Sequence, residues 1–116
     1  MFERIDTIVL KVTELEKASR WYQEYLGLNE VFKGEGYRVL QVGGGDTPLT
    51  LEHRSEGHPI KQNLSYPIFF PTDLEGAYRQ LKEKGVEVST IKSDGTNSYF
   101  HFYDPDGNRL EVCHWS

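Results

Sequence analysis

The chain repeats one short pattern, and this duplication limits the folds that it can adopt. Residues 12–18 read VTELEKA, and residues 71–77 read PTDLEGA, 59 residues further along the chain. The same offset aligns Arg20 with Arg79. A repeat of this length is typical of a duplicated supersecondary unit rather than of a solenoid with short repeats. The sequence therefore predicts two similar modules within its 116 residues.

Each copy shows the same order of elements. A short apolar run, at 8–12 in the first copy and at 67–70 in the second, predicts a strand. The next segment has apolar residues at helical spacing and ends near Gly27 or Gly85, as a helix often ends at a glycine. Three apolar segments bounded by turn residues then predict three strands in each copy, at 29–32, 37–42, 49–53, 87–91, 99–103 and 109–114.

This order predicts an α+β protein made of two tandem βαβββ modules. Module one covers residues 1–53, module two covers residues 64–116, and the polar stretch 54–63 between them is interpreted as a linker. The length suits a single domain formed by both modules.

Charge and composition exclude several classes of partner. The net charge is −5, whereas nucleic-acid binding requires a basic face. No apolar run approaches the roughly 20 residues of a membrane span, and the opening MFERIDTIVLKV does not resemble a signal peptide. A lone cysteine, Cys113, excludes an intramolecular disulfide. We therefore expect a cytoplasmic protein that binds neither nucleic acid nor membranes.

Three local motifs carry a family resemblance. Residues 10–28 (LKVTELEKASRWYQEYLGL) form the first, Gly85-Val86 the second, and residues 104–111 (DPDGNRLE) the third. In this order and spacing they resemble the vicinal oxygen chelate superfamily. That superfamily includes glyoxalase I, extradiol dioxygenases, fosfomycin-resistance thiol transferases and bleomycin-resistance proteins.

The resemblance implies a curved, mostly antiparallel sheet shaped as a cup, with the helices on its outer face. Strand alternation then decides which side chains line the cup. The cup would offer aromatic walls and a few polar groups, which suits a flat or partly cationic organic ligand. The expected ligand-binding residues are Thr7, Val9, Gln41, Glu52, Tyr66, Ile68, Phe70, Tyr99, His101, Tyr103 and Glu111.

The resemblance also implies where a metal would bind. Metal-dependent members take their ligands from the first and last strand of each module, and these positions correspond to Thr7, Glu52, Tyr66 and Glu111. The two carboxylates are present, but threonine and tyrosine stand where the family usually has imidazole. A reduced site of Glu52 and Glu111, completed by His101 or water, is the alternative.

Two classes of function follow. The first is a metal-free protein that binds a small organic molecule, as bleomycin-resistance proteins do, with no cofactor. The alternative is an enzyme that resembles glyoxalase lyases, dioxygenases or thiol transferases, uses Zn, Ni, Mn or Fe, and has Glu111 and His101 as catalytic residues. A metal-free enzyme with Glu111 or His101 as general base lies between them. The resemblance further implies a homodimer.

Overall fold

The duplication predicted from the sequence is present as two units with the same order of helices and strands. The computed structural model describes residues 1–55 and 65–115. The chain divides into the units Met1–Pro59 and Ile60–Ser116. Within the described residues each unit holds one helix and four strands in the order β-α-β-β-β. The predicted α+β class and its two βαβββ modules are therefore confirmed, while the predicted linker 54–63 lies mostly outside the described residues.

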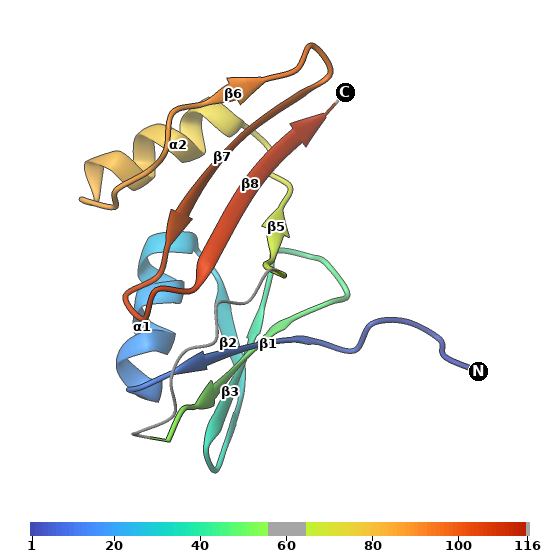
Figure 1. The fold of residues 1–116 in the computed structure, drawn as a ribbon. Coiled ribbons are helices and arrows are strands. Elements are labelled where there is room, and N and C mark those ends of the chain that lie inside the picture. Colours follow the sequence, from blue (N-terminus) through green and yellow to red (C-terminus); the bar gives the residue numbers. More distant parts are fainter. Residues whose placement is uncertain (56–64, 116) are drawn as a thin grey trace. The chain divides into compact units, whose positions relative to one another are not determined.

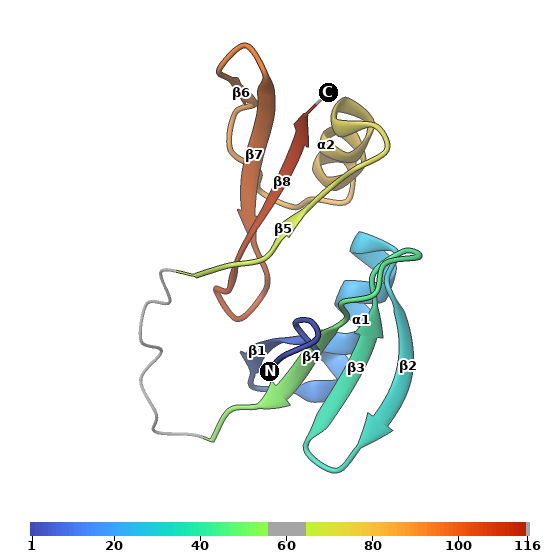
Figure 2. The same cartoon turned by 90° about the vertical axis from the view of Figure 1, so that its right-hand side faces the viewer.

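In the first unit, a four-stranded mixed sheet packs against one helix. The sheet has the order β1-β4-β3-β2, with β1 parallel to β4 and the other neighbours antiparallel. Helix α1 lies along one side of this sheet (Figure 2). The elements are β1 (Ile8–Val12), α1 (Leu15–Leu26), β2 (Asn29–Gly34), β3 (Tyr37–Gln41) and β4 (Leu49–His53).

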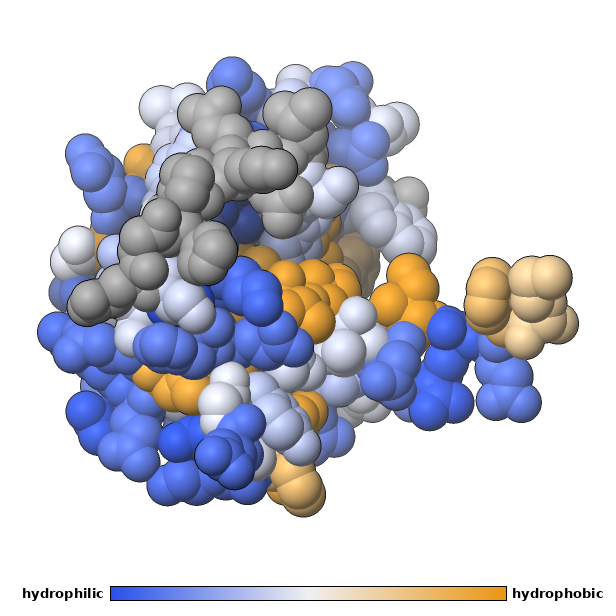
Figure 3. Space-filling view, turned by 60° about the horizontal axis from the view of Figure 1, so that its bottom comes forward, coloured by the Kyte–Doolittle hydropathy of each residue, from blue (hydrophilic) through white to orange (hydrophobic). Residues whose placement is uncertain are grey.

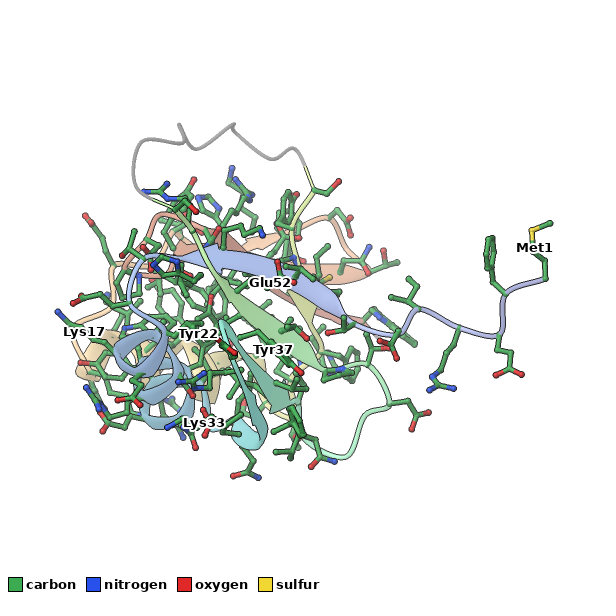
Figure 4. The ribbon with its side chains drawn as sticks, turned by 90° about the horizontal axis from the view of Figure 1, so that it is seen from below. Met1, Lys17, Tyr22, Lys33, Tyr37 and Glu52 are labelled. Atoms are coloured by element: carbon green, nitrogen blue, oxygen red, sulfur yellow. The ribbon has the colours of Figure 1, made fainter. Side chains whose placement is uncertain are left out.

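Alternation along the strands creates the core of this unit. Val12, Leu40 and Leu51 are completely buried on the side covered by α1, and Tyr22 of the helix is buried against them. Figure 4 shows the Tyr22 side chain between α1 and the strands, whereas Lys17 lies on the outer side of the helix. Among the described residues of this unit, no helix covers the opposite side of the sheet.

The second unit repeats this arrangement with shorter edges. Its sheet has the order β5-β8-β7-β6, again with a parallel first pair, and α2 lies along one side (Figure 1). The buried side chains on that side include Phe100, Phe102 and Leu110. The elements are β5 (Ile68–Phe69), α2 (Leu74–Glu83), β6 (Lys92–Ser93), β7 (Asn97–Tyr103) and β8 (Arg109–Trp115).

The strand predicted at 87–91 is wrong. Only Val88 forms an isolated bridge there, and β6 begins at Lys92. The Ser89 hydroxyl accepts a hydrogen bond from the His101 amide at 2.9 Å, while the Ser89 amide donates to the His101 carbonyl. Because a side chain takes the place of a strand carbonyl, a regular ladder does not form at this point.

Helix ends follow the sequence in part. Gly27 ends α1 in the left-handed conformation (φ 71°), and its amide donates to the Gln23 carbonyl, as a helix C-terminus requires. The N-cap residues are Glu14 and Asp73, and neither side chain makes a capping hydrogen bond. No helix in the described part of the chain is both long and apolar enough to cross a bilayer.

A buried arginine ties α1 to the sheet. The Nη1 atom of Arg38 donates to the carbonyl oxygens of Gly34 (2.9 Å) and Tyr37 (2.8 Å). Its Nε lies 3.6 Å from Glu30, and its Nη2 lies 3.7 Å from Glu16 of the helix. Because Arg38 is only 7% exposed, these partners compensate for the removal of its charge from water.

We expect Arg38→Met to lower the free energy of unfolding by about 2–4 kcal/mol, because it keeps the aliphatic stem but removes the donor to two carbonyl groups and the cation beside Glu30. Urea denaturation followed by circular dichroism measures this change. Arg79→Met, on the exposed side of α2, is the matched control and should change stability by less than about 0.5 kcal/mol. Equal stability of the two variants would contradict a stabilising function of the Arg38 contacts.

Candidate functional site

The uncovered side of the second sheet carries most of the predicted site residues. Leu110 and Val112 of β8 are buried toward α2, so Glu111 and Cys113 lie on the other side. In β7 the same alternation places Tyr99, His101 and Tyr103 on that side. We call this surface the helix-free face of the second unit and define it by Tyr66, Ile68, Lys92, Tyr99, His101, Tyr103, Arg109 and Glu111.

Strand register places three of the predicted residues in one row. Glu111 of β8 pairs with Ile68 of β5 on one side and with His101 of β7 on the other. One step along, Arg109 pairs with Tyr103. Because paired residues of neighbouring strands share a face, the Glu111 and His101 side chains are direct neighbours.

The DPDGN motif builds the turn that sets this register. The buried Asp104 carboxylate accepts hydrogen bonds from the amides of Asp106 (2.9 Å) and Asn108 (2.8 Å) and from the Asn108 side chain. Gly107 adopts φ 86°, a conformation that glycine tolerates best. The motif is therefore structural, and it holds Tyr103 and Arg109 opposite each other.

Arg109 lies on this face at the start of β8. It was not among the site residues predicted from the sequence. Its Nη2 lies 3.3 Å from Glu111 Oε1, and its guanidinium lies 4.6 Å from the centre of the Tyr66 ring. Burial disfavours the charged form, but the hydrogen bond to Glu111 and the Tyr66 and Tyr103 side chains raise the pKa of Arg109 above its ordinary value. Arg109 precedes Glu111 by two residues in a strand, so alternation alone could have identified it.

His101 is kept neutral by its surroundings. Burial lowers the pKa of the imidazole below 6.5, and the positive charges of Arg109 and Lys92 lower it further, while Glu111 opposes them. A neutral imidazole has one donor and one acceptor nitrogen. His101 can therefore hydrogen-bond a ligand in either sense at neutral pH.

Large apolar side chains surround these polar groups. Ile68 and Tyr103 are 56% and 51% exposed. Phe70, 58% exposed, lies at the other end of β8, where it stacks on His114 with ring centres 5.0 Å apart and contacts Trp115 at 5.2 Å. Elsewhere most of the surface drawn in Figure 3 is polar (blue), with apolar side chains (orange) in smaller groups.

The uncovered side of the first sheet is more polar. The Thr7 hydroxyl donates to the Pro48 carbonyl (2.9 Å) and lies 2.7 Å from the Thr50 hydroxyl. Val9, 40% exposed, pairs with Thr50. Gln41 ends β3 two residues beyond Val39, the partner of Thr50, so it lies on the same face and close to this pair.

Glu52 does not lie beside Thr7. It pairs in register with Lys11, four residues further along β1, and its Oε1 lies 2.6 Å from Lys11 Nζ (Figure 4). In the second unit Glu111 pairs with Ile68, whereas in the first unit Thr50 pairs with Val9. By register, therefore, Thr50 corresponds to Glu111. The apolar-polar-apolar run Leu49-Thr50-Leu51 matches Leu110-Glu111-Val112 and is the signal that could have shown this.

The donor groups do not form the metal site usual for this arrangement. Both carboxylates already contact a cation of their own unit, and the Thr7 hydroxyl is bonded to protein oxygens. The Tyr66 ring lies under Arg109. Among the described residues, no group of three or more His, Cys, Asp or Glu side chains could hold a metal ion. The Glu52–Glu111–His101 metal site stays a prediction.

Comparison with known proteins gives several matches. Biphenyl-2,3-diol 1,2-dioxygenase 3 of Rhodococcus globerulus is 31% identical over 94% of this chain and 62% of its own length. The chain thus spans about three fifths of the dioxygenases that it matches. Glutathione transferase FosA of Serratia marcescens is 28% identical over 97% of this chain and 81% of its own.

Solved structures and a family model point the same way. The structure of TnmS3, an antibiotic binding protein from Streptomyces sp. CB03234, superposes with a TM-score of 0.83 over 99% of this chain and 98% of its own, at 24% identity. The model of the Glyoxalase/Bleomycin resistance protein/Dioxygenase superfamily matches residues 4–112. The family resemblance carried by the sequence motifs is therefore confirmed, and the chain belongs to the Glyoxalase/Bleomycin resistance protein/Dioxygenase superfamily.

Proposed function

We propose that this chain binds a small aromatic molecule on the helix-free face of the second unit and does so without a metal. The observation that carries the proposal is that exposed apolar side chains lie beside the polar residues Arg109, Glu111 and His101 on one face of the sheet. Ile68 and Tyr103 are more than half exposed. Exposed apolar groups with a few convergent polar anchors are typical of small-molecule sites.

The polar anchors suit recognition rather than metal coordination. Glu111 is engaged by Arg109, and Glu52 by Lys11, so each carboxylate has a cation within its own unit. A divalent ion at either carboxylate would have to compete with that cation. His101 and Tyr103 remain as hydrogen-bonding groups beside the apolar walls. The fold is also that of a protein described as antibiotic binding, so a binding function requires no new architecture.

The second candidate is a metal-dependent enzyme of the dioxygenase or thiol-transferase kind. Its support is the position of His101 directly opposite Glu111 in the strand register, which places one nitrogen and one carboxylate donor on the same face. Relatives named as a dioxygenase and as a glutathione transferase agree with it. A metal there would act as a Lewis acid on a bound oxygen, while His101 or Glu111 would move a proton.

A cytoplasmic homodimer remains part of the proposal. Val31 and Phe32 of the edge strand β2 are 56% and 55% exposed, which is typical of strands that pair with another chain.

We expect sedimentation at micromolar concentration to give twice the chain mass of 13.4 kDa. A Phe32→Lys variant that sediments as a monomer would locate the contact, whereas a monomeric natural chain would contradict it.

Tyr103 should contribute to aromatic binding. The exposed aromatic ring at the site is Tyr103, which is paired with Arg109. In isothermal titration with biphenyl-2,3-diol or 1-naphthol, we expect Tyr103→Ala to weaken binding about tenfold, because a stacking surface is lost. Phe2→Ala is the matched control, since Phe2 is 89% exposed and precedes both sheets. Tyr103→Ala should keep its circular dichroism spectrum. If neither compound binds the natural chain, or if both variants bind alike, binding at this face is contradicted.

Binding should not depend on a metal. We expect the same affinity for biphenyl-2,3-diol in EDTA and after addition of Mn²⁺, Fe²⁺, Ni²⁺ or Zn²⁺, and no rise in melting temperature with any of these ions. Glu111→Gln should leave this insensitivity unchanged. A rise of several degrees with one ion, abolished by Glu111→Gln, would favour the metal-dependent enzyme instead.

A further inference from the structure

The charges on the helix-free face distinguish among aromatic ligands. The strand residues of this face include two cations, Lys92 and Arg109, and one anion, Glu111. The fields of both cations reach His101, since both lower the pKa of its imidazole. The whole chain carries a net charge of −5, so this face departs from the overall charge in sign. A ligand group near His101 therefore experiences a positive local potential.

The aromatic surface that a cationic ligand would use is already occupied. The Arg109 guanidinium lies 4.6 Å from the centre of the Tyr66 ring, within the range of a cation–π contact. A ligand cation at Tyr66 would have to displace Arg109 from both the ring and Glu111. The partly cationic ligand expected from the sequence is therefore disfavoured at this position.

Arg109 has unused hydrogen-bonding capacity. A guanidinium has five N–H donors. One Nη2 contacts one Glu111 carboxylate oxygen at 3.3 Å, and the Tyr103 side chain is a second hydrogen-bond partner. The contact to Glu111 is long for a charged pair, which usually closes to about 2.7–2.9 Å. The Arg109 Nε is buried and has no hydrogen-bond partner among the described residues. The side chain is still 32% exposed, so a second acceptor can approach the guanidinium.

We propose that the natural ligand of this face is a small aromatic carboxylate, whose carboxylate binds Arg109 and whose ring packs against Ile68 and Tyr103. This inference rests on the proposed binding function and specifies the ligand class. A carboxylate matches the planar fork of a guanidinium and can bind it through two oxygens. The ring then covers side chains that are otherwise exposed to water.

Three probes with one ring system test the charge requirement. Isothermal titration of the full chain compares 1-naphthoate, the uncharged 1-naphthamide and the cationic 1-naphthylmethylammonium. We expect 1-naphthoate to bind about tenfold more tightly than 1-naphthamide, because charge-assisted hydrogen bonds to Arg109 are gained, and the ammonium to bind most weakly. Equal affinities for the carboxylate and the amide would overturn the ligand class but leave the proposed function standing.

Two variants test whether Arg109 is the reason that the carboxylate binds more tightly than the amide. Arg109→Gln should reduce the ratio of the two affinities to about one, while Arg79→Gln, on an exposed position of α2, should leave it at about ten. An unchanged ratio in Arg109→Gln would overturn the inference. If circular dichroism shows that Arg109→Gln is unfolded, the exposed Lys92→Gln replaces it, with the ratio expected to fall about twofold. Failure of all three probes to bind would overturn the proposed function together with this inference.

Discussion

The one-sided burial of each sheet is the constraint on which the rest of the structure depends. A four-stranded sheet has two faces, and each unit supplies only one helix to cover them. Leucine, valine and phenylalanine alternate with polar or aromatic residues along β4, β7 and β8, so one face becomes core. The other face is left with side chains that stability alone does not require. Function can therefore change on that face while the packing under the helix is preserved.

Both carboxylates on these faces have acquired a partner of their own. A partly buried carboxylate is unfavourable without a compensating charge or donors. Metal-dependent members of a family with this architecture can meet that need with the metal itself. Here Lys11 and Arg109 meet it from within the chain, at 2.6 Å and 3.3 Å. The two contacts differ in kind, because the Lys11 pair is exposed, whereas Arg109 also packs on Tyr66. Only the second pair builds a structured polar centre.

The sequence was sufficient for the modules and for the faces of individual strands, because both depend on local periodicity. It failed where side chains interfere with backbone pairing or where register must be known. Ser89 interrupts the predicted strand at 87–91 by giving its hydroxyl to the His101 amide. Counting 59 residues from Glu111 leads to Glu52, but the β1–β4 register gives Thr50. A shift of two residues keeps the face, so only the match of the run Leu49-Thr50-Leu51 to Leu110-Glu111-Val112 could have revealed it.

Tyr66 stands where the family usually has an imidazole, and Arg109 contacts Glu111 where a metal would otherwise do so. These two residues depend on each other physically. Tyr66 cannot donate a neutral nitrogen to a metal, but its ring provides a surface for a guanidinium. Arg109 can lie on that ring only because it is two residues from Glu111 on the same strand, where alternation aims both side chains to one side. Once the guanidinium is there, it neutralises Glu111 and favours a neutral His101. A change at Tyr66 alone would therefore remove the ring that supports Arg109 beside Glu111 and His101.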